Sequence, residues 1–348
     1  MKQALREDAE VYVDGFPLGG GAGSGPPENP VIGHTDIELM DLVLLRDGDD
    51  HKGWYLAAAP YTGDPDAWLG WNLLRSIDGG ESYTLFLNGS AAALMGRATQ
   101  ALPAPRAWTT WDRVNSVTIR ALPGAEIPSS STEAAVLNGA NAAILGDEII
   151  NFVDVVDNGD GTYILSTLLR GQRGSDPFIG THALGDRFVL VQFPKVSDIS
   201  DQDLNLARDY KSQSVGDPRI PATFQVFADR GNRLRPLTAA DPKLTDGGGG
   251  DLALAWQRRS RLGGEDDWAD GSLAVPLGEA SEAYEVDIYD GSDVVRTVAA
   301  ASPAITYTAA QQTADFGGGQ SSLKVAIYQM SETVGRGFGL AANLVKGA

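Results

Sequence analysis

The sequence predicts a mainly β protein made of several small domains. Its 348 residues are too many for one small core, and 43% of them are hydrophobic, which is ample for two or three cores. The apolar residues gather in short runs rich in Val, Ile, Phe and Tyr, as strands do. Asn-Gly, Asp-Gly and longer glycine clusters separate these runs, and such pairs supply the backbone angles of tight turns.

Residues 1–30 are predicted to be a leader followed by a Gly/Pro linker. Val11–Phe16 suits a short strand, and Gly19–Pro27 suits flexible coil that stiffens into an extended proline segment. The start of the chain turns acidic at Glu7 and lacks the apolar centre of a secretory signal peptide. With no apolar run of about eighteen residues, we expect no membrane insertion by this chain.

Residues 31–105 are predicted to form a first β domain. Its expected strands are His34–Leu45, Trp54–Ala59 and Tyr83–Leu87. The segment before the third strand resembles an Asp-box, a hairpin turn in which short polar side chains bond to the loop backbone. We expect Ser76, Asp78 and Ser82 to have this structural role.

Residues 106–235 are predicted to form a second β domain around one hairpin. Glu148–Val156 and Thr162–Leu169 have strand composition, and the turn between them carries Asn-Gly and Asp-Gly. The other expected strands are Val117–Leu122 and Arg187–Gln192. The best helix candidate is Asp198–Arg208, where Asp198 and Ser200 offer caps.

Residues 236–250 end in a glycine run and are predicted to be a linker, so the third domain is expected at 251–348. Its apolar runs have the spacing of a β-sandwich. Trp256 in an early strand and Tyr284 opening the next resemble a fibronectin type III domain, and we expect a structural or interface role for both. The expected strands are Leu252–Trp256, Tyr284–Tyr289, Val294–Val298, Ala304–Thr308, Leu323–Gln329 and Leu340–Leu344.

The charge and the cysteine count exclude several functions. The net charge is −19, which repels phosphate backbones and disfavours nucleic acid as a partner. The best local exception is the short basic cluster at Arg258, Arg259 and Arg261. No cysteine is present, so the chain has no disulfide, thiolate metal site or cysteine nucleophile.

Catalytic motifs are weak. His34, His51 and His182 stand in unrelated contexts without paired-ligand spacing, so a structural or exposed role is expected for each. No GxSxG nucleophile elbow is visible. Acidic doublets occur at Asp49-Asp50, Asp147-Glu148 and Asp266-Asp267, but neighbouring residues of a strand point to opposite faces and do not oppose each other as glycosidase carboxylates must.

Two acidic turns are weak calcium candidates. One contains Asp47 and Asp49, and the other contains Asp157 and Asp160. Calcium prefers several oxygen ligands on a flexible loop, but neither turn has the full EF-hand pattern. A hairpin turn explains both more simply, so we expect neither metal nor cofactor.

Aromatic and arginine residues suggest interfaces. Trp108 and Trp111 lie among prolines at an inferred domain junction, where packing is favoured over a glycan-stacking platform. Arg170 and Arg173 leave the central hairpin on a glycine-rich backbone. We expect them to pair with carboxylates of a neighbouring domain or chain and so to hold modules together.

Two stretches resemble a known family. The wording LNGANAAILGDEIINF…GTYILSTLLRGQRG at 137–174, and WQRRSRLGGEDDWADG…VPLGEASEAYEV…YTAAQQTADFG…VAIYQMS from 256 to 331, are similar to the large tail-tip protein of gene transfer agents and related siphophages. That protein is a "megatron"-type baseplate hub or fibre, and the resemblance is to its C-terminal part. It implies larger domains upstream, a homotrimer around the tail axis, and tail hub and distal tail proteins as partners.

We therefore expect a structural virion component of a phage-like tail tip, assembled in the host cytoplasm, that acts by contact and is not an enzyme. A glycan or protein of the host envelope is its expected receptor. Two alternatives remain open. A free-standing glycan-binding module would be a soluble monomer, and a cell-wall polysaccharide hydrolase would need a pocket with opposed carboxylates.

Overall fold

The computed structural model describes residues 31–191, 195–216, 221–263 and 275–347. The predicted leader, linker and strand within residues 1–30 and the Asp266-Asp267 doublet lie outside these ranges. The described chain is nearly all β, as predicted, with two α-helices, α1 (Glu133–Leu137) and α2 (Ala309–Phe316). No helix among the described residues has the length and apolar character needed to cross a membrane.

Two sheets form the first β module. One has the order β1-β2-β11 and the other the order β13-β12-β3-β4. Trp54, Trp71, Leu73 and Tyr210 form the buried core of this module, because alternate residues of each strand face inward. The bounds are β1 (Thr35–Met40), β2 (Tyr55–Pro60), β3 (Trp71–Ser76), β4 (Thr84–Gly89), β11 (Lys195–Val196), β12 (Arg208–Ser214) and β13 (Thr223–Phe227).

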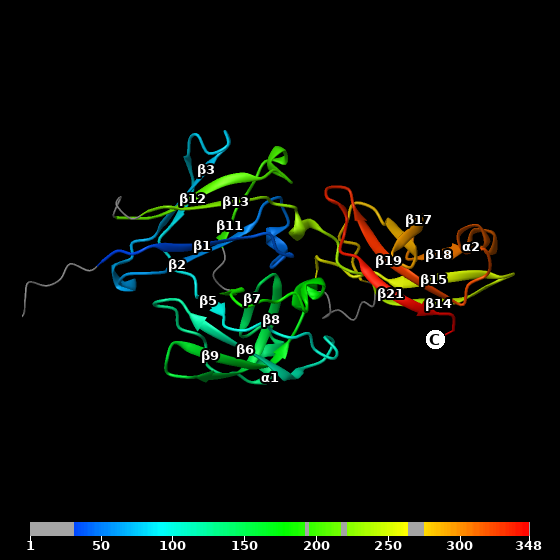
Figure 1. Cartoon of the computed structure of the whole chain (residues 1–348), viewed down its shortest axis with the longest axis horizontal. Coiled ribbons are helices and arrows are strands. Elements are labelled where there is room, and N and C mark those ends of the chain that lie inside the picture. The colour runs from blue at the N-terminus through cyan, green and yellow to red at the C-terminus, as the bar shows by residue number, and fades with distance from the viewer. Residues whose placement is uncertain (1–30, 192–194, 217–220, 264–274, 348) are drawn as a thin grey trace, which may run out of the picture. The chain divides into compact units, whose positions relative to one another are not determined.

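A closed barrel forms the second module, with the order β10-β5-β6-β9-β8-β7 (Figure 1, cyan to green). The predicted central hairpin supplies β8 and β9, and its turn falls at the expected glycines. Phe152 and Phe188 lie in its core. The bounds are β5 (Met95–Ala98), β6 (Asp112–Ala121), β7 (Ala142–Leu145), β8 (Glu148–Asp157), β9 (Thr162–Leu169) and β10 (Arg187–Leu190).

The barrel lies within the sequence of the first module. Strands β11 and β12 follow the barrel in the chain but pair with β2 and β3, which precede it, and β13 pairs with β12. The structure thus differs from the expected division at residues 105 and 106, which falls between β5 and β6 of the barrel. Strand composition marks where strands occur, but it does not say which strands pair.

The third module is the predicted fibronectin type III-like sandwich (Figure 1, yellow to red). One sheet has the order β14-β15-β18, and the other has β17-β16-β19 with β20 and β21 also paired to β19. Trp256 and Tyr284 pack edge to face in its core, with ring centroids 5.2 Å apart. The bounds are β14 (Ala240–Gly248), β15 (Asp251–Gln257), β16 (Tyr284–Asp290), β17 (Asp293–Ala300), β18 (Ala304–Tyr307), β19 (Ser322–Ser331), β20 (Gly335–Arg336) and β21 (Leu340–Val345).

The segment predicted to be a linker, 236–250, is part of this sandwich. Its residues form strand β14, which pairs with β15. Gly248, Gly249 and Gly250 all have positive φ and make the hairpin turn between these strands. The glycine run therefore marks a turn inside the domain, because the same conformational freedom serves both linkers and tight turns.

The predicted helix at Asp198–Arg208 is absent. Within this described segment only a 3-10 turn, η5 (Asp201–Asp203), forms before β12 begins at Arg208. Asp203 accepts hydrogen bonds from Ser200, Arg75 and Arg208, and these tertiary bonds prevail over a weak helix signal. The other 3-10 turns are η1 (Asp47–Asp49), η2 (Pro65–Ala67), η3 (Gln172–Gly174), η4 (Asp176–Phe178) and η6 (Asn232–Leu234).

Candidate functional site

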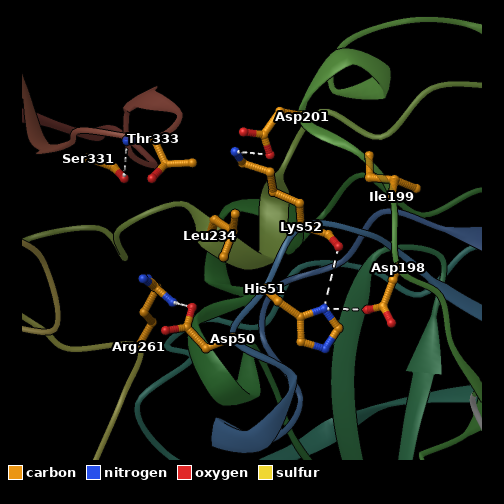
Figure 2. Close-up of a pocket in the computed structure, with 10 residues that line it drawn as sticks. All are labelled: Asp50, His51, Lys52, Asp198, Ile199, Asp201, Leu234, Arg261, Ser331 and Thr333. Atoms are coloured by element: carbon orange, nitrogen blue, oxygen red, sulfur yellow. Dashed lines mark hydrogen bonds and ion pairs between the residues drawn. The ribbon is translucent and has the colours of Figure 1, made fainter.

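The described structure contains a cleft of about 510 Å³. Figure 2 shows its lining, which comes from the turn after η1, the segment after β11, η6 and the sandwich. The lining residues are Asp50, His51, Lys52, Asp198, Ile199, Asp201, Leu234, Arg261, Ser331 and Thr333. Ligand sites of proteins often have this size, but their walls are mostly apolar, and this lining is mostly polar.

The charged groups of the cleft pair with one another. Lys52 Nζ lies 2.6 Å from Asp201 Oδ1, and His51 Nδ1 lies 2.8 Å from Asp198 Oδ1. Arg261 pairs with Asp50 and also donates to Glu279 Oε1 over 2.9 Å. Asp201, Asp50 and Glu279 thus have cationic partners and Asp198 has an imidazole beside it, an arrangement that suits a polar seam better than general acid and base catalysis.

The basic cluster of the sequence serves contacts within the chain. Arg258 donates to Glu282, and Arg259 donates to Asp176 Oδ1 and Thr238, at 2.7 to 2.9 Å. Because Asp176 belongs to η4, next to the barrel, Arg259 joins the sandwich to the barrel segment. With Arg261 paired as well, these three guanidiniums are engaged with carboxylates.

Arg170 is buried inside the barrel. Its Nε and Nη2 donate to the two oxygens of Glu148 over 2.8 Å each, and its Nη1 donates to Asp112 and to the carbonyl of Pro103. The guanidinium has no exposed surface. The expected pairing with another domain or chain is therefore incorrect for Arg170: its carboxylate partners lie on β8 and β6 of the same barrel.

Glu148 receives a third and a fourth hydrogen bond. The amide of Gly171 donates to Oε1, and His182 Nε2 lies 2.7 Å from Oε2. Burial by itself raises the pKa of Glu148, but the hydrogen bonds from His182 and Arg170 outweigh it and hold that pKa below its usual value. His182 Nδ1 in turn lies 3.1 Å from Asp186 Oδ2, so the cluster is a closed structural network.

Arg173 has a different position from Arg170. It follows a left-handed glycine and is itself left-handed, with φ of 55°. Its Nη1 donates to the carbonyl of Leu45, which lies in the first module. Arg173 therefore bridges the barrel and the first module, as an interface residue would.

The Asp-box residues lie in the β3–β4 turn. Asp78 Oδ1 accepts from the hydroxyl of Ser76 and the amide of Ser82, and Oδ2 accepts from the hydroxyl of Ser82. Ser76 also accepts from the amide of Gly80 over 2.9 Å. The hydroxyls of Ser76 and Ser82 lower the pKa of Asp78 well below its usual value.

The calcium candidates are engaged in turns. Asp49 accepts from Arg46 and from the hydroxyl of Tyr55, and Asp47 accepts from the amide of Gly263. Asp157 and Asp160 accept from amides of their own hairpin turn. Within the described ranges, no three acidic or histidine side chains gather as metal ligands would.

The members of each acidic doublet have different partners, in the turn at η1 and in the turn that leads into β8. Asp49 points to Tyr55, whereas Asp50 pairs with Arg261. Asp147 pairs with Arg187 on the barrel rim, whereas Glu148 is buried. Trp108 is 39% exposed and lies beneath the guanidinium of Arg259, 5.5 Å from ring centroid to Cζ, and Trp111 contacts Arg113 in the same way.

Sequence reasoning missed the second contact of His51. Its Nδ1 lies 2.8 Å from Arg233 Nη2 as well as 2.8 Å from Asp198. It also missed the pair formed by Asp41 and Asp229, at opposite ends of the module's sequence. The residues next to Asp41 and Asp229 in the sequence give no sign of a distant partner, so only the fold shows that these two groups interact.

Comparison with protein families gives one match. The family described as "Rcc01698-like, C-terminal" matches residues 93–189, and it is related to the gene transfer agent of Rhodobacter capsulatus. The matched residues coincide with the barrel, β5 to β10. The strands of the first module and those of the sandwich lie outside the matched residues.

Solved structures offer only distant similarity. The rat CD45 extracellular region, domains d3-d4, is 11% identical over 43% of this chain and 68% of its own, with a TM-score of 0.23. The chicken CNTN1 FN1-FN3 domains are 8% identical over 91% of this chain and 98% of their own, also with a TM-score of 0.23. These scores are too low to carry an argument. No curated protein matches the chain.

Proposed function

We propose that this protein is a structural component of the tail tip of a phage-like particle, such as a gene transfer agent. There it acts by assembly and contributes to attachment to the host surface. The match of the barrel to a gene-transfer-agent-related family is the observation that carries the proposal. The sequence stretches that resemble tail-tip proteins, at 137–174 and 256–331, agree with it.

The use of the charged residues supports a structural role. Arg170, Glu148 and His182 are buried in one network, and Arg259 and Arg261 pair across modules. Groups with these partners stabilise a folded arrangement, whereas a catalytic acid or base must be available to a substrate. We therefore propose that the chain is not an enzyme.

An exposed sheet face supports assembly with other chains. Four residues lie side by side across this sheet, one on each strand: Phe224 on β13, Lys211 on β12, Leu74 on β3 and Leu85 on β4. Phe224 and Leu85 are 61% and 57% exposed, and neighbouring Val226 is also exposed. Lys211 lies between these apolar side chains, so the face is partly apolar and partly cationic. Exposed apolar side chains on a sheet face are typical of surfaces that other chains cover; copies of this chain in a trimer, or tail hub and distal tail proteins, are the partners we propose.

Imaging of intact particles tests the proposal. A peptide tag at the C-terminus, located by labelling and cryo-electron microscopy, should lie at the tip of the tail in a small fixed copy number. Deleting the gene should give particles that lack tips and fail to adsorb to host cells. Particles of normal form and infectivity without this chain would refute the proposal.

A glycan-binding module is the second candidate, and the polar cleft favours it. The hydroxyls of Ser331 and Thr333, with the surrounding ion pairs, offer donors and acceptors that a sugar can use. A purified chain that binds host polysaccharide in solution, yet is absent from particles, would favour this alternative.

A further inference from the structure

One ring nitrogen of His51 has partners that require opposite protonation; besides the two described next, it lies 3.4 Å from the carbonyl oxygen of Lys52, which can only accept. Nδ1 lies 2.8 Å from Arg233 Nη2, which can only donate, and 2.8 Å from Asp198 Oδ1, which accepts when ionised. Figure 2 shows the imidazole in the cleft with Asp198 beside it. A nitrogen with a free lone pair suits Arg233, and a nitrogen that carries hydrogen suits Asp198. Both contacts therefore cannot be favourable at once.

Arg233 is a buried anchor of the segment that precedes the sandwich. Arg233 is 1% exposed. Its Nε donates to the carbonyl of His51, and its Nη2 also donates to the carbonyl of Ser197 over 3.2 Å. The guanidinium lies over the ring of Tyr55, 5.6 Å from the centroid. Arg233 thus ties residues 229–235, called here the anchor segment, to the strand β2 region and to the segment after β11.

The anchor segment is also held from the opposite side. Asp41, at the end of β1, accepts hydrogen bonds from the amides of Arg230 and Asn232 over 2.9 and 2.8 Å. Beyond the segment, the amide of Phe338 donates to the carbonyl of Pro236, which belongs to the contact with the sandwich. A change at Arg233 is therefore transmitted to the place where the sandwich begins.

The charges around the imidazole make its protonation consequential. Lys52, Asp50 and Arg261 line the same cleft, and Asp198 is 85% exposed at its side chain. On the other side, Asp49 and Asp229 are the acidic groups that act on Arg233. A proton added to His51 meets Asp198 favourably and the buried guanidinium unfavourably, because two like charges in direct contact repel.

We propose that His51 is a proton-controlled latch for the anchor segment. With Nδ1 unprotonated, His51 accepts from Arg233 and fixes residues 229–235. With Nδ1 protonated, His51 turns its hydrogen to Asp198, Arg233 loses an acceptor and gains a neighbouring cation, and the anchor segment loosens. Histidine side chains change charge between about pH 5 and 8, so mild acid releases the latch.

The test compares the wild-type chain with His51→Asn in the full-length protein. The Asn amide oxygen can stand where Nδ1 stands and accepts from Arg233 at every pH. His34→Asn, on the same module but outside the cleft lining, is the matched control. Hydrogen exchange of the Arg230 and Asn232 amides is followed between about pH 8 and 5.5, corrected for intrinsic exchange, and ¹⁵N NMR reports the protonation of Nδ1.

In the wild type and in His34→Asn, protection of these amides should fall about fivefold toward pH 5.5, the effect of about one hydrogen bond, relative to His51→Asn. Nδ1 should carry no hydrogen where the two amides are protected and should carry one where their protection has fallen. Equal pH dependence in wild type and His51→Asn would overturn the proposal. A hydrogen on Nδ1 throughout this range would overturn it as well.

Discussion

The guanidinium of Arg170 is satisfied within the barrel by Glu148, Asp112 and the carbonyl of Pro103. A buried ion pair adds little stability over an apolar pair of similar shape, because desolvation opposes the attraction. Removing one partner is different, since the other charge then stays buried without compensation. This asymmetry makes Arg170 a sensitive position.

Arg170→Ala should lower the free energy of unfolding by about 3 to 5 kcal/mol, because Glu148 is left buried and partly unpaired. Urea unfolding followed by fluorescence measures the change. Arg113→Ala is the control: its ion pair with Glu133 is 55% and 44% exposed at the side chains, and its loss should cost less than about 1 kcal/mol. Equal losses in the two variants would contradict the role assigned to Arg170.

Asp41 and Asp229 give a second prediction at this scale. Burial, and then the charge of Asp229, raise the pKa of Asp41 from 3.8 to about 7, and burial also raises the pKa of Asp229. Among the described residues Asp229 Oδ2 has no donor, and a proton held between the two carboxyls supplies one. The folded protein binds this proton more tightly than the unfolded chain, so the pair's stabilising contribution is lost as the pH rises from about 4 through about 7.

Asp41→Asn should therefore lose less stability than the wild type between those pH values, because its amide stays neutral. Urea unfolding at several pH values in that window gives the comparison. Asp36→Asn, on the same strand β1, is a control for a general effect of charge. A wild-type stability that rises across the window in step with Asp41→Asn would rule out the shared proton.

At the scale of elements, the Asp-box turn is held by one carboxylate. Asp78→Ala should speed hydrogen exchange at the Ser82 amide, which loses its acceptor, and leave exchange in the barrel strands unchanged. Ser82→Ala is a milder comparison because it removes the hydroxyl bond but keeps the amide bond. Unchanged protection of Ser82 in Asp78→Ala would show that the β3–β4 pairing alone holds the turn.

Strands that are rich in β-branched and aromatic residues could be predicted from the sequence. Thr162–Leu169 matches β9 residue for residue, and the six predicted sandwich strands overlap β15 to β19 and β21, because each joins an apolar run to a clear turn. The two-residue strand β20 has no such run and is not predicted. Strand β14, ADPKLTDGG, was missed because it is polar, mostly exposed and contains proline. Among the candidate site residues, Arg170 was recognised as a partner of carboxylates, but a sequence does not reveal which carboxylate a fold brings to it.

At the scale of the molecule, the modules are joined by specific side chains. Arg259 and Asp176 pair over 2.8 Å with side chains 25% and 11% exposed, and Phe178 and Phe338 meet edge to face at 5.7 Å. The interleaving of the first module and the barrel was beyond sequence reasoning, since the pairing of β11 and β12 with β2 and β3 spans more than a hundred residues. The pattern of apolar and turn residues along a short segment does not indicate which distant strand it pairs with.

A double-mutant cycle of Arg259→Ala and Asp176→Ala should give a coupling free energy of about 1 kcal/mol, because this partly buried pair joins the sandwich to the barrel segment. Lys243 and Asp241, whose side chains are 62% and 49% exposed within β14, provide a cycle with coupling near zero. Additive effects at Arg259 and Asp176 would mean that the pair contributes nothing to the junction.

The two ends of the barrel meet beside one strand. The amide of Ala93 donates to the carbonyl of Ala58 on β2, the amide of Leu190 donates to the carbonyl of Leu94, and β11 then pairs with β2. A domain whose two ends lie close together can be exchanged for another by recombination without a change in the fold of the rest of the chain. Tyr55 and Ala57 of β2 share a hydrophobic core with Met95, Ile144 and Val189 of the barrel. Any domain that replaces the barrel must therefore present an apolar surface of the same shape to β2.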